Sequence, residues 1–174
     1  MKTLNAALAT VTLMLIGCAS TAMKSPDVSE SIRKSLDAVS LRDVSVSADR
    51  DKGVVTLGGH VTSDGEKAQA ESLAKSLAGS QVVANEIAVT PPGAEKEAKQ
   101  INSDLDKAIE KNLDAALIQK SMLKGVTFAA NNGVVTLSGE VDSQAKRASV
   151  QKRAEAIVNV KQVVNDLQTS RRLV

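Results

Sequence analysis

The 174-residue chain has one cysteine, one histidine and one phenylalanine, and it has no tryptophan or tyrosine. A disulfide needs two cysteines and a structural zinc site needs several cysteine and histidine ligands, so one chain can build neither. Single-stranded nucleic acid is usually bound on aromatic side chains, and a net charge of +2 adds no broad basic field. No nucleophile is paired with a general base in any recognisable pattern. We therefore expect no metal, no cofactor, no nucleic acid and no catalysis.

Residues 1–17 have the pattern of a bacterial export signal. Lys2 supplies one early positive charge, and the apolar stretch after it is too short and too diluted by Asn5 and Thr10 to span a bilayer. The stretch ends in Leu-Ile-Gly-Cys, which resembles the lipobox of bacterial lipoproteins. This resemblance implies that Cys18 is lipidated and becomes the first residue of the mature chain. Each buried acyl methylene contributes about 0.8 kcal/mol, so several acyl chains anchor a protein without a spanning helix.

The residues after the cysteine indicate which membrane receives the lipid. Ala19 and Ser20 stand where an aspartate would resemble an inner-membrane retention signal. We therefore expect attachment to the outer membrane, on its periplasmic side. Residues 18–27 would form a lipidated tether, which at about 3.5 Å per residue keeps the first folded unit close to the bilayer.

The rest of the chain repeats itself after 80 positions. Residues 53–90 align with residues 133–170 without a gap, and 12 of the 38 pairs are identical. The duplication predicts two small domains rather than one large core. Between the copies, Pro91-Pro92-Gly93 interrupts regular structure and predicts a short linker that can run into the next helix. The predicted organisation is a signal at 1–17, a tether at 18–27, domains at 28–90 and 102–170, a linker at 91–101 and a tail at 171–174.

Each copy is expected to begin with an amphipathic helix. In the first copy, apolar residues recur at helical spacing from Val28 to Val39. In the second copy, Ser103 and Asp106 resemble a capping box, and the helix is expected over residues 104–124 with Leu105 on its buried face.

A strand, a tight turn and a second strand follow in both copies. The turns are Asp-Lys-Gly and Asn-Asn-Gly, and each is followed by Val-Val-Thr-Leu. Small and apolar residues at helical spacing then predict a second helix, over residues 64–77 and 144–158, and alternating apolar residues predict a last strand. A strand that follows a crossover helix normally pairs in parallel. The predicted fold class is α+β, with two tandem αββαβ domains, each a three-stranded mixed sheet covered on one face by two helices.

Two sequence segments in each copy resemble a known family. Gly-Val-Val-Thr-Leu-x-Gly-x-Val stands at residues 53–61 and 133–141, and Val-x-Asn-x-Ile/Leu stands at residues 83–87 and 163–167. Together with the order of elements, these segments resemble the BON domain, and a lipobox before two copies resembles the dual-BON outer-membrane lipoproteins. The resemblance implies a periplasmic location, a link to envelope or osmotic stress and, for some members, binding of anionic phospholipid through the second domain.

Several polar and glycine positions are expected to serve the fold rather than a site. The only histidine, His60, is expected on a surface loop after the second strand, and its counterpart is Glu140. The carboxylates Asp49, Asp51, Asp64 and Glu66 do not have calcium-loop spacing and are expected to be solvated turn charges. We assign structural roles in turns, strand exits and buried hydrogen bonds to Gly53, Gly59, Asn85, Gly133, Gly139 and Asn165. The amides of Asn85 and Asn165 are expected to hold a neighbouring loop.

Charge divides unequally between the copies. Residues 28–90 have 7 basic and 9 acidic side chains, a net charge of −2, whereas residues 102–174 have 11 and 8, a net charge of +3. On a helix over residues 104–124, two lysines and two apolar residues fall on the face opposite the core. Basic and apolar groups on one face are typical of contact with an anionic bilayer. The predicted lipid-binding residues are Lys107, Lys111, Ile118, Met122 and Lys124.

Two functions remain open from the sequence. The first is a non-enzymatic outer-membrane lipoprotein that supports envelope integrity and binds anionic phospholipid through its second domain. The alternative is a stress-related periplasmic module that binds envelope proteins, or acts like a chaperone, without specific lipid binding. The lipid-binding BON domains resembled here have an aromatic anchor on this helix, and this chain has none there.

Overall fold

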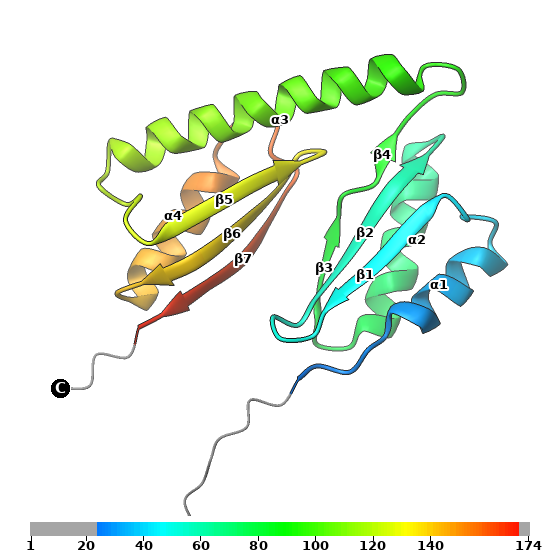
Figure 1. Ribbon diagram of the computed structural model, residues 1–174, viewed down its shortest axis with the longest axis horizontal. Helices are drawn as coiled ribbons and strands as arrows, with labels where there is room; N and C mark the ends of the chain where they lie inside the picture. The colour runs from blue at the N-terminus through cyan, green and yellow to red at the C-terminus, as the bar shows by residue number, and fades with distance from the viewer. Residues whose placement is uncertain (1–23, 171–174) are drawn as a thin grey trace, which may run out of the picture.

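The computed structural model describes residues 24–170, so the predicted signal, Cys18 and the tail at 171–174 lie outside the described residues. Both repeats follow the order helix, strand, strand, helix, strand (Figure 1). Repeat 1 (residues 28–90) contains α1 (Ser29–Ala38), β1 (Val44–Asp49), β2 (Val54–Val61), α2 (Asp64–Ala78), β3 (Val82–Asn85) and β4 (Ala88–Val89). Repeat 2 (residues 102–170) contains α3 (Glu95–Ile118), which begins before it, β5 (Val126–Asn131), β6 (Val134–Val141), α4 (Gln144–Glu155) and β7 (Gln162–Thr169).

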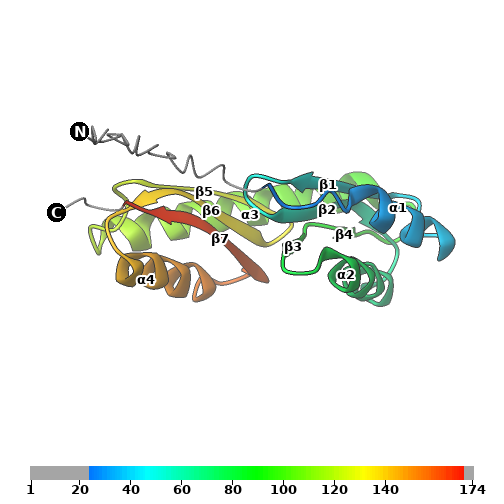
Figure 2. The same ribbon diagram turned by 90° about the horizontal axis from the view of Figure 1, so that it is seen from below.

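Each repeat forms a mixed sheet with its helices on one face. The first two strands pair antiparallel, and the last strand pairs in parallel with the middle one, in the orders β1-β2-β3 and β5-β6-β7. In repeat 1 the last strand is interrupted, and β4 pairs with the far end of β2. Figure 2 shows α4 and α2 on the same side of the molecule. The predicted α+β class and the order αββαβ are confirmed.

The first helix of each repeat packs against the first strand and the second helix of that repeat. Ile32 and Leu36 of α1 are buried in the core of repeat 1, together with Leu57 of β2. Ile109 and Leu113 of α3 are buried in the core of repeat 2 in the same way. The second helices begin at a serine cap, because the Ser63 and Ser143 hydroxyls accept hydrogen bonds from the backbone three residues further on. Small buried residues such as Ala70 and Ala74 let α2 lie close to its sheet.

The helix-free faces of the two repeats meet through equivalent positions. Val134 and Val164 of repeat 2 are buried in a small cluster with Ala84, and Val54 packs against it. These four residues form two pairs related by the 80-residue offset of the duplication, Val54 with Val134 and Ala84 with Val164. The contact therefore joins the same surface of each repeat, as in a twofold-symmetric dimer.

Polar contacts at this interface repeat the same relation. Lys52 Nζ lies 3.4 Å from an Asp166 carboxylate oxygen, and the side chain of Asn132 donates to the Glu86 carbonyl oxygen at 2.7 Å. Lys52 corresponds to Asn132, and Asp166 corresponds to Glu86. The Gln162 side chain adds an asymmetric contact, because it accepts from Asn85 N at 3.0 Å and donates to the Val83 carbonyl oxygen at 2.7 Å. The side chain thus occupies the free edge of β3.

α3 differs from its prediction at the N-terminal end. It begins at Glu95, so Ser103 lies inside the helix and is not its cap. Glu95 and Glu97 provide favourable acidic charge in the first turn, and the Gly93 N–H donates to Glu95 Oε1 at 2.9 Å. The extension carries α3 past repeat 2 toward β4 (Figure 1). Leu105 lies one turn before Ile109, the first buried residue of α3, and is 40% exposed, which corrects its predicted burial.

α3 also ends earlier than residue 124. Ser121 has a positive φ of 53°, Met122 N donates to the Leu117 carbonyl oxygen at 2.9 Å, and Ser121 N donates to the Ile118 carbonyl oxygen at 3.0 Å. This is a Schellman termination, in which a residue in the left-handed region stops the helix. α1 ends in the same way at Ser40, whose φ is 66°. The second helix of repeat 2 likewise stops at Glu155, three residues before its predicted end.

The glycines before the ends of β2 and β6 have a different role from the predicted strand exits. Gly59 and Gly139 lie inside these strands with φ of 87° and 114°. A Cβ at Gly59 would stand 2.0 Å from the Asp43 carbonyl oxygen, and one at Gly139 would stand 2.4 Å from that of Gly125. Only glycine fits this close backbone approach. Because β2 continues beyond Gly59 to Val61, His60 lies in this strand rather than in a loop. Its side chain is exposed, as predicted.

Candidate functional site

Three of the predicted lipid-binding residues share the outer face of α3. Lys107, Lys111 and Ile118 are all exposed, and Ile118 is 56% exposed. Lys107 Nζ lies 3.5 Å from an Asp104 carboxylate oxygen in an exposed ion pair. α3 as a whole has four lysines and six carboxylates, a net charge of −2. The lysines of this face are thus set on an acidic helix.

The other two predicted residues lie beyond the helix. Met122 follows the left-handed Ser121 and packs, partly buried, against the core of repeat 2. It takes the position after the helix stop that Leu41 has in repeat 1, so its main contacts are with the protein. Lys124 is exposed on the loop before β5, and its carbonyl oxygen accepts from Lys146 Nζ at 2.9 Å. The structure therefore does not bring Met122 and Lys124 onto the face of Lys107 and Lys111.

α4 is the basic helix of the described chain. It has Lys146, Arg147, Lys152 and Arg153 against Glu155, a net charge of +3. Lys152 is exposed and Arg153 is half-buried. None of the ion pairs within residues 24–170 involves either of them. Neither residue is among the predicted lipid-binding residues, because the net charge of the whole repeat hides the concentration of basic residues on this one helix. The net charge of each predicted helix is the signal that reveals them.

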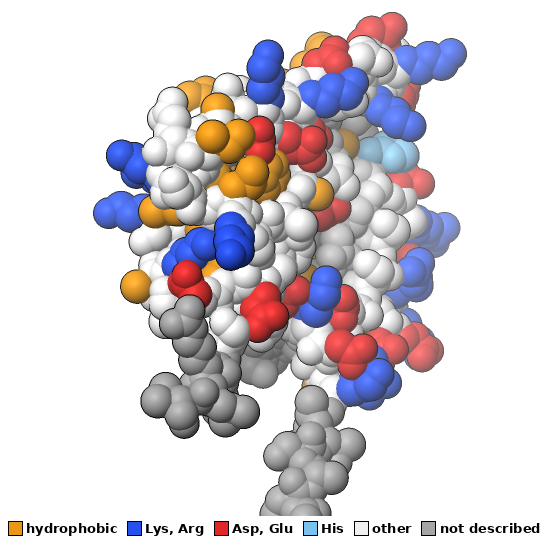
Figure 3. All heavy atoms as spheres, turned by 60° about the vertical axis from the view of Figure 1, so that its left-hand side comes forward, with side chains coloured by type: hydrophobic (Ala, Val, Ile, Leu, Met, Phe, Trp, Pro, Cys, Tyr) orange, Lys and Arg blue, Asp and Glu red, His pale blue; other side chains and the backbone are white. Residues whose placement is uncertain are grey.

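A hollow lies between α3 and α4, and we call it the α3–α4 groove. Its volume is about 510 Å³. Figure 3 shows hydrophobic side chains at the end of repeat 2, with basic and acidic side chains around them. No acidic residue is among those that line the groove, which are Ala116, Met122, Ser149, Lys152, Arg153, Ala156 and Ile157.

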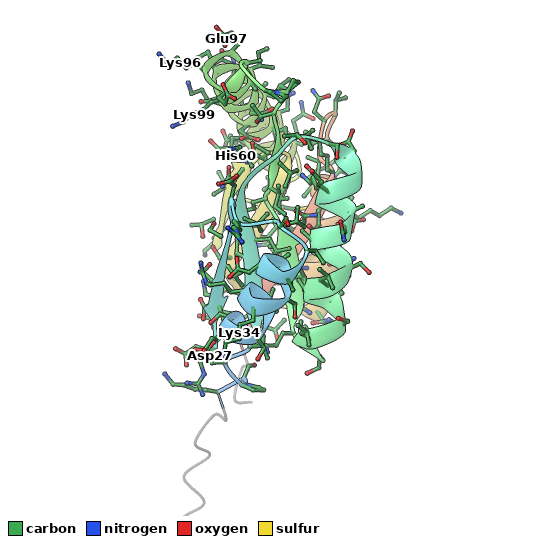
Figure 4. The ribbon with its side chains drawn as sticks, turned by 90° about the vertical axis from the view of Figure 1, so that its right-hand side faces the viewer. Asp27, Lys34, His60, Lys96, Glu97 and Lys99 are labelled. Atoms are coloured by element: carbon green, nitrogen blue, oxygen red, sulfur yellow. The ribbon has the colours of Figure 1, made fainter. Side chains whose placement is uncertain are left out.

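A second, larger hollow lies between the repeats, under the N-terminal half of α3. Its volume is about 610 Å³, and its walls include His60 of β2 and Lys99 of α3. Figure 4 shows His60 below the first turns of α3, from which Lys96, Glu97 and Lys99 project. The carboxylates on its α3 wall already have protein partners. Asp106 accepts from the Asn132 and Gly133 N–H groups at 2.8 and 2.9 Å, and Glu110 accepts from Ala130 N at 2.9 Å.

Two charged groups near this junction have shifted pKa values. Burial raises the pKa of Glu86 above its ordinary range, and the nearby Asp106 carboxylate adds to this, while a hydrogen bond from Asn131 opposes it. Burial, followed by the positive charge of Lys161, lowers the pKa of Lys67. Lys67 Nζ donates to the Ile87 carbonyl oxygen at 2.6 Å, so this lysine bridges α2 to the interruption between β3 and β4.

The two strand asparagines connect the last strand to the second helix. Asn85 is 4% exposed, and its side-chain NH₂ donates to a Glu71 carboxylate oxygen at 2.9 Å. In the same way, the Asn165 NH₂ donates to Gln151 Oε1 at 2.8 Å. Each amide oxygen also accepts the backbone N–H two residues further along. These are structural bonds, and they reach a helix rather than the neighbouring loop that we expected.

Of the remaining sequence candidates, Asp51 and the two hairpin glycines lie in turns, whereas Asp49 ends β1 and Asp64 and Glu66 lie in the first turn of α2, which corrects their predicted place in turns. Gly53 and Gly133 end the two hairpin turns, with φ of 65° and 83°. Asp49 accepts from the backbone of the turn after β1, Asp51 pairs with Lys24, and a Glu66 carboxylate oxygen accepts from Thr62 N at 2.8 Å. Within residues 24–170 the structure shows no group of three or more histidine, cysteine, aspartate or glutamate side chains placed to bind a metal. It also shows, in that range, no helix long and apolar enough to cross a bilayer.

The fold and these sites describe a tandem pair of αββαβ domains that meet at the last strands of their sheets. The BON domain model matches residues 25–91 and 99–171, one match for each repeat. The chain belongs to the BON domain family.

One protein from Escherichia coli and two solved structures are also similar to this chain. The chain is 32% identical over 136 residues to the osmotically-inducible protein Y of Escherichia coli (strain K12), covering 77% of this chain and 66% of that protein. It thus spans just under two thirds of that relative's length. Two structures of CdsD, a structural protein of the type III secretion system of Chlamydia trachomatis, match 81% of this chain at 15% and 14% identity. They cover 63% and 66% of those chains with TM-scores of 0.35 and 0.34, which are too low to support any argument.

Proposed function

We propose that this protein is a non-enzymatic lipoprotein of the outer membrane, facing the periplasm, that supports envelope integrity under osmotic stress by binding anionic phospholipid through repeat 2. Its similarity to a protein named for osmotic induction supports the link to stress. The export signal and the lipobox at Cys18 support the anchor and the compartment. Together they give a protein held at a bilayer surface.

The observation behind the lipid contact is the exposed Ile118 on the same face of α3 as Lys107 and Lys111. An apolar side chain enters the headgroup region while each nearby lysine contributes about 1 kcal/mol at an anionic surface. Repeat 1 has a net charge of −2 and is repelled by the same surface, whereas residues 102–174 have +3. The charge difference therefore turns repeat 2 toward the membrane.

Ile118→Asp tests the lipid contact. We expect more than tenfold weaker binding to vesicles of phosphatidylcholine with phosphatidylglycerol, measured by co-sedimentation of the mature protein without its lipid. Val39→Asp is the matched control, because Val39 is an exposed apolar residue at the end of α1 in repeat 1. Equal binding of the unmodified protein to vesicles with and without phosphatidylglycerol would contradict the proposal and leave protein binding as the alternative.

Cys18→Ser tests the anchor separately. The variant should be released from the membrane fraction or should retain its uncleaved signal, as judged by fractionation and by the mass of the protein. A variant that remains in the outer membrane with a processed N-terminus would show that Cys18 is not the attachment point.

A further inference from the structure

The charges of repeat 2 do not lie mainly on the helix with the predicted lipid-binding residues. α3 has a net charge of −2, and its Lys107 is paired with Asp104. α4, which packs beside α3, has a net charge of +3. An anionic ligand drawn to repeat 2 is therefore attracted most strongly to the side of the repeat on which α4 lies.

The hollow on that side has room for one acyl chain of a lipid. The α3–α4 groove has a volume of about 510 Å³, within the range of about 300 to 1,000 Å³ that is typical of small-molecule sites. Ala116 and Met122 give it an apolar wall on the α3 side, and Ala156 and Ile157 give it one on the α4 side. Apolar walls of this kind suit an acyl chain, which gains from leaving water.

The polar groups of the groove suit the headgroup. Lys152 and Arg153 are consecutive residues in the last turn of α4, and both line the groove. Arginine binds phosphate through two parallel N–H groups, and lysine adds a second positive charge. The hollow between the repeats differs, because Glu95, Asp106 and Glu110 line it together with its cations. Charge complementarity thus selects the α3–α4 groove for an anion.

We infer that the α3–α4 groove binds a single anionic phospholipid, with the phosphate at Lys152 and Arg153 and an acyl chain along Ala116, Met122 and Ile157. This inference rests on the proposed function and adds to it a specific lipid site on α4. The outer face of α3 then lies against the bilayer surface, and the groove takes one lipid from it. Met122, which packs against the core, belongs to the wall of the site rather than to a free membrane anchor.

The test neutralises the two groove cations. Lys152→Gln with Arg153→Gln should weaken binding to vesicles of phosphatidylcholine with phosphatidylglycerol by about 25-fold, because each basic group near an anionic surface contributes a factor of about five. Lys34→Gln with Lys75→Gln removes the same charge from exposed positions of repeat 1 and should change binding less than about threefold. Equal losses in both double variants would overturn the inference, since they would indicate a general charge effect.

A second variant places a negative charge inside the groove. Ala156→Glu puts a carboxylate at an exposed groove position, and Ser76→Glu puts one at the equivalent exposed position of α2. Only Ala156→Glu should abolish binding, with the melting temperature unchanged relative to Ser76→Glu. Inorganic phosphate should displace the protein from the vesicles only weakly, because it lacks an acyl chain. If phosphate bound the protein as tightly as the vesicles do, the groove would be a phosphate site and the lipid site would be overturned.

The outcomes separate this inference from the proposed function. If Ile118→Asp abolishes vesicle binding while both groove variants bind like the unmodified protein, the groove inference is wrong and the proposed function stands. If the unmodified protein shows no preference for phosphatidylglycerol, both are wrong.

Discussion

The second helices of the two repeats occupy the same place in the fold and differ in charge. α2 has two lysines and three carboxylates, a net charge of −1, whereas α4 has a net charge of +3. Both begin at a serine cap, and both bury Ala74 or its counterpart Ala154 against the sheet. The duplication has therefore kept the buried side of this helix and changed the exposed side. Differences between the repeats point to function, and their identities point to the fold.

The close backbone approach at Gly59 and Gly139 is a feature that both repeats share, and we expect the largest effect there. Gly59→Ala and Gly139→Ala should each lower the free energy of unfolding by about 3 kcal/mol, since a positive φ and a backbone clash add up. Gly79→Ala is the control, because Gly79 has a φ of 62° and open space around it, and it should cost about 1 kcal/mol. Urea unfolding measures all three. If Gly59→Ala or Gly139→Ala were as mild as Gly79→Ala, the repeats would not depend on this close backbone approach.

The strand asparagines should differ in strength between the repeats. Asn85→Ala should cost about 2 kcal/mol, because it removes a hydrogen bond to the charged Glu71 and leaves the buried Ile87 N–H without its partner. Asn165→Ala should cost about 1 kcal/mol, because its partner Gln151 is neutral. Thermal unfolding of the two variants checks the order. Equal costs would mean that the charge of Glu71 adds nothing.

The Gln162 side chain is a contact that only one repeat provides. Gln162→Ala should cost about 1 to 2 kcal/mol and should make the two repeats unfold less cooperatively, because two hydrogen bonds to β3 are lost. Gln168→Ala, on the exposed end of β7, should change stability by less than about 0.5 kcal/mol. Calorimetry detects both effects. Unchanged stability in Gln162→Ala would mean that these bonds do not join the repeats.

The smallest effect is expected from the pH dependence of Glu86. Its folded-state pKa is raised, so the stabilisation from its protonated form is complete below the ordinary pKa of 4.5 and is lost as the pH rises through the raised value. Glu86→Gln should therefore unfold at a higher temperature than the unmodified protein at pH 7. The gain in the free energy of unfolding should be less than about 1 kcal/mol, because the Glu86 side chain is half exposed. The difference should disappear at pH 4. Asp166→Asn, the equivalent change in repeat 2, should instead destabilise the protein at pH 7, because it weakens the contact with Lys52. If Asp166→Asn stabilised the protein at pH 7, the two equivalent carboxylates would not differ in the way that we predict.

The sequence predicts the fold well because the duplication and the alternation of apolar residues are local signals. Val54 and Leu57, for example, can be assigned to a strand from their own segment. The predicted start of α3 was wrong because Ser103 and Asp106 resemble a capping box. The helix in fact begins at Glu95, where Glu95 and Glu97 place acidic charge in its first turn. Asp106 instead binds the hairpin of repeat 2, a contact between residues 26 and 27 positions apart.

The candidate site is less predictable than the fold. Lys107, Lys111 and Ile118 were placed together correctly because they lie within one helix. Met122 was misplaced because the stop at Ser121 requires a left-handed backbone that serine rarely adopts. The α3–α4 groove could not be found from periodicity, because it depends on how two helices distant in sequence pack side by side.

The reciprocal contact between β3 and β7 has a consequence for solubility. An open edge strand exposes a row of unpaired N–H and C=O groups and is a template for aggregation. In this chain, the last strand of each repeat lies at the edge of its sheet and faces the last strand of the other. The Gln162 amide takes the place of a neighbouring strand at β3. Each repeat thus shields the other from pairing with foreign chains, and the unit that resists aggregation is the pair rather than the single domain.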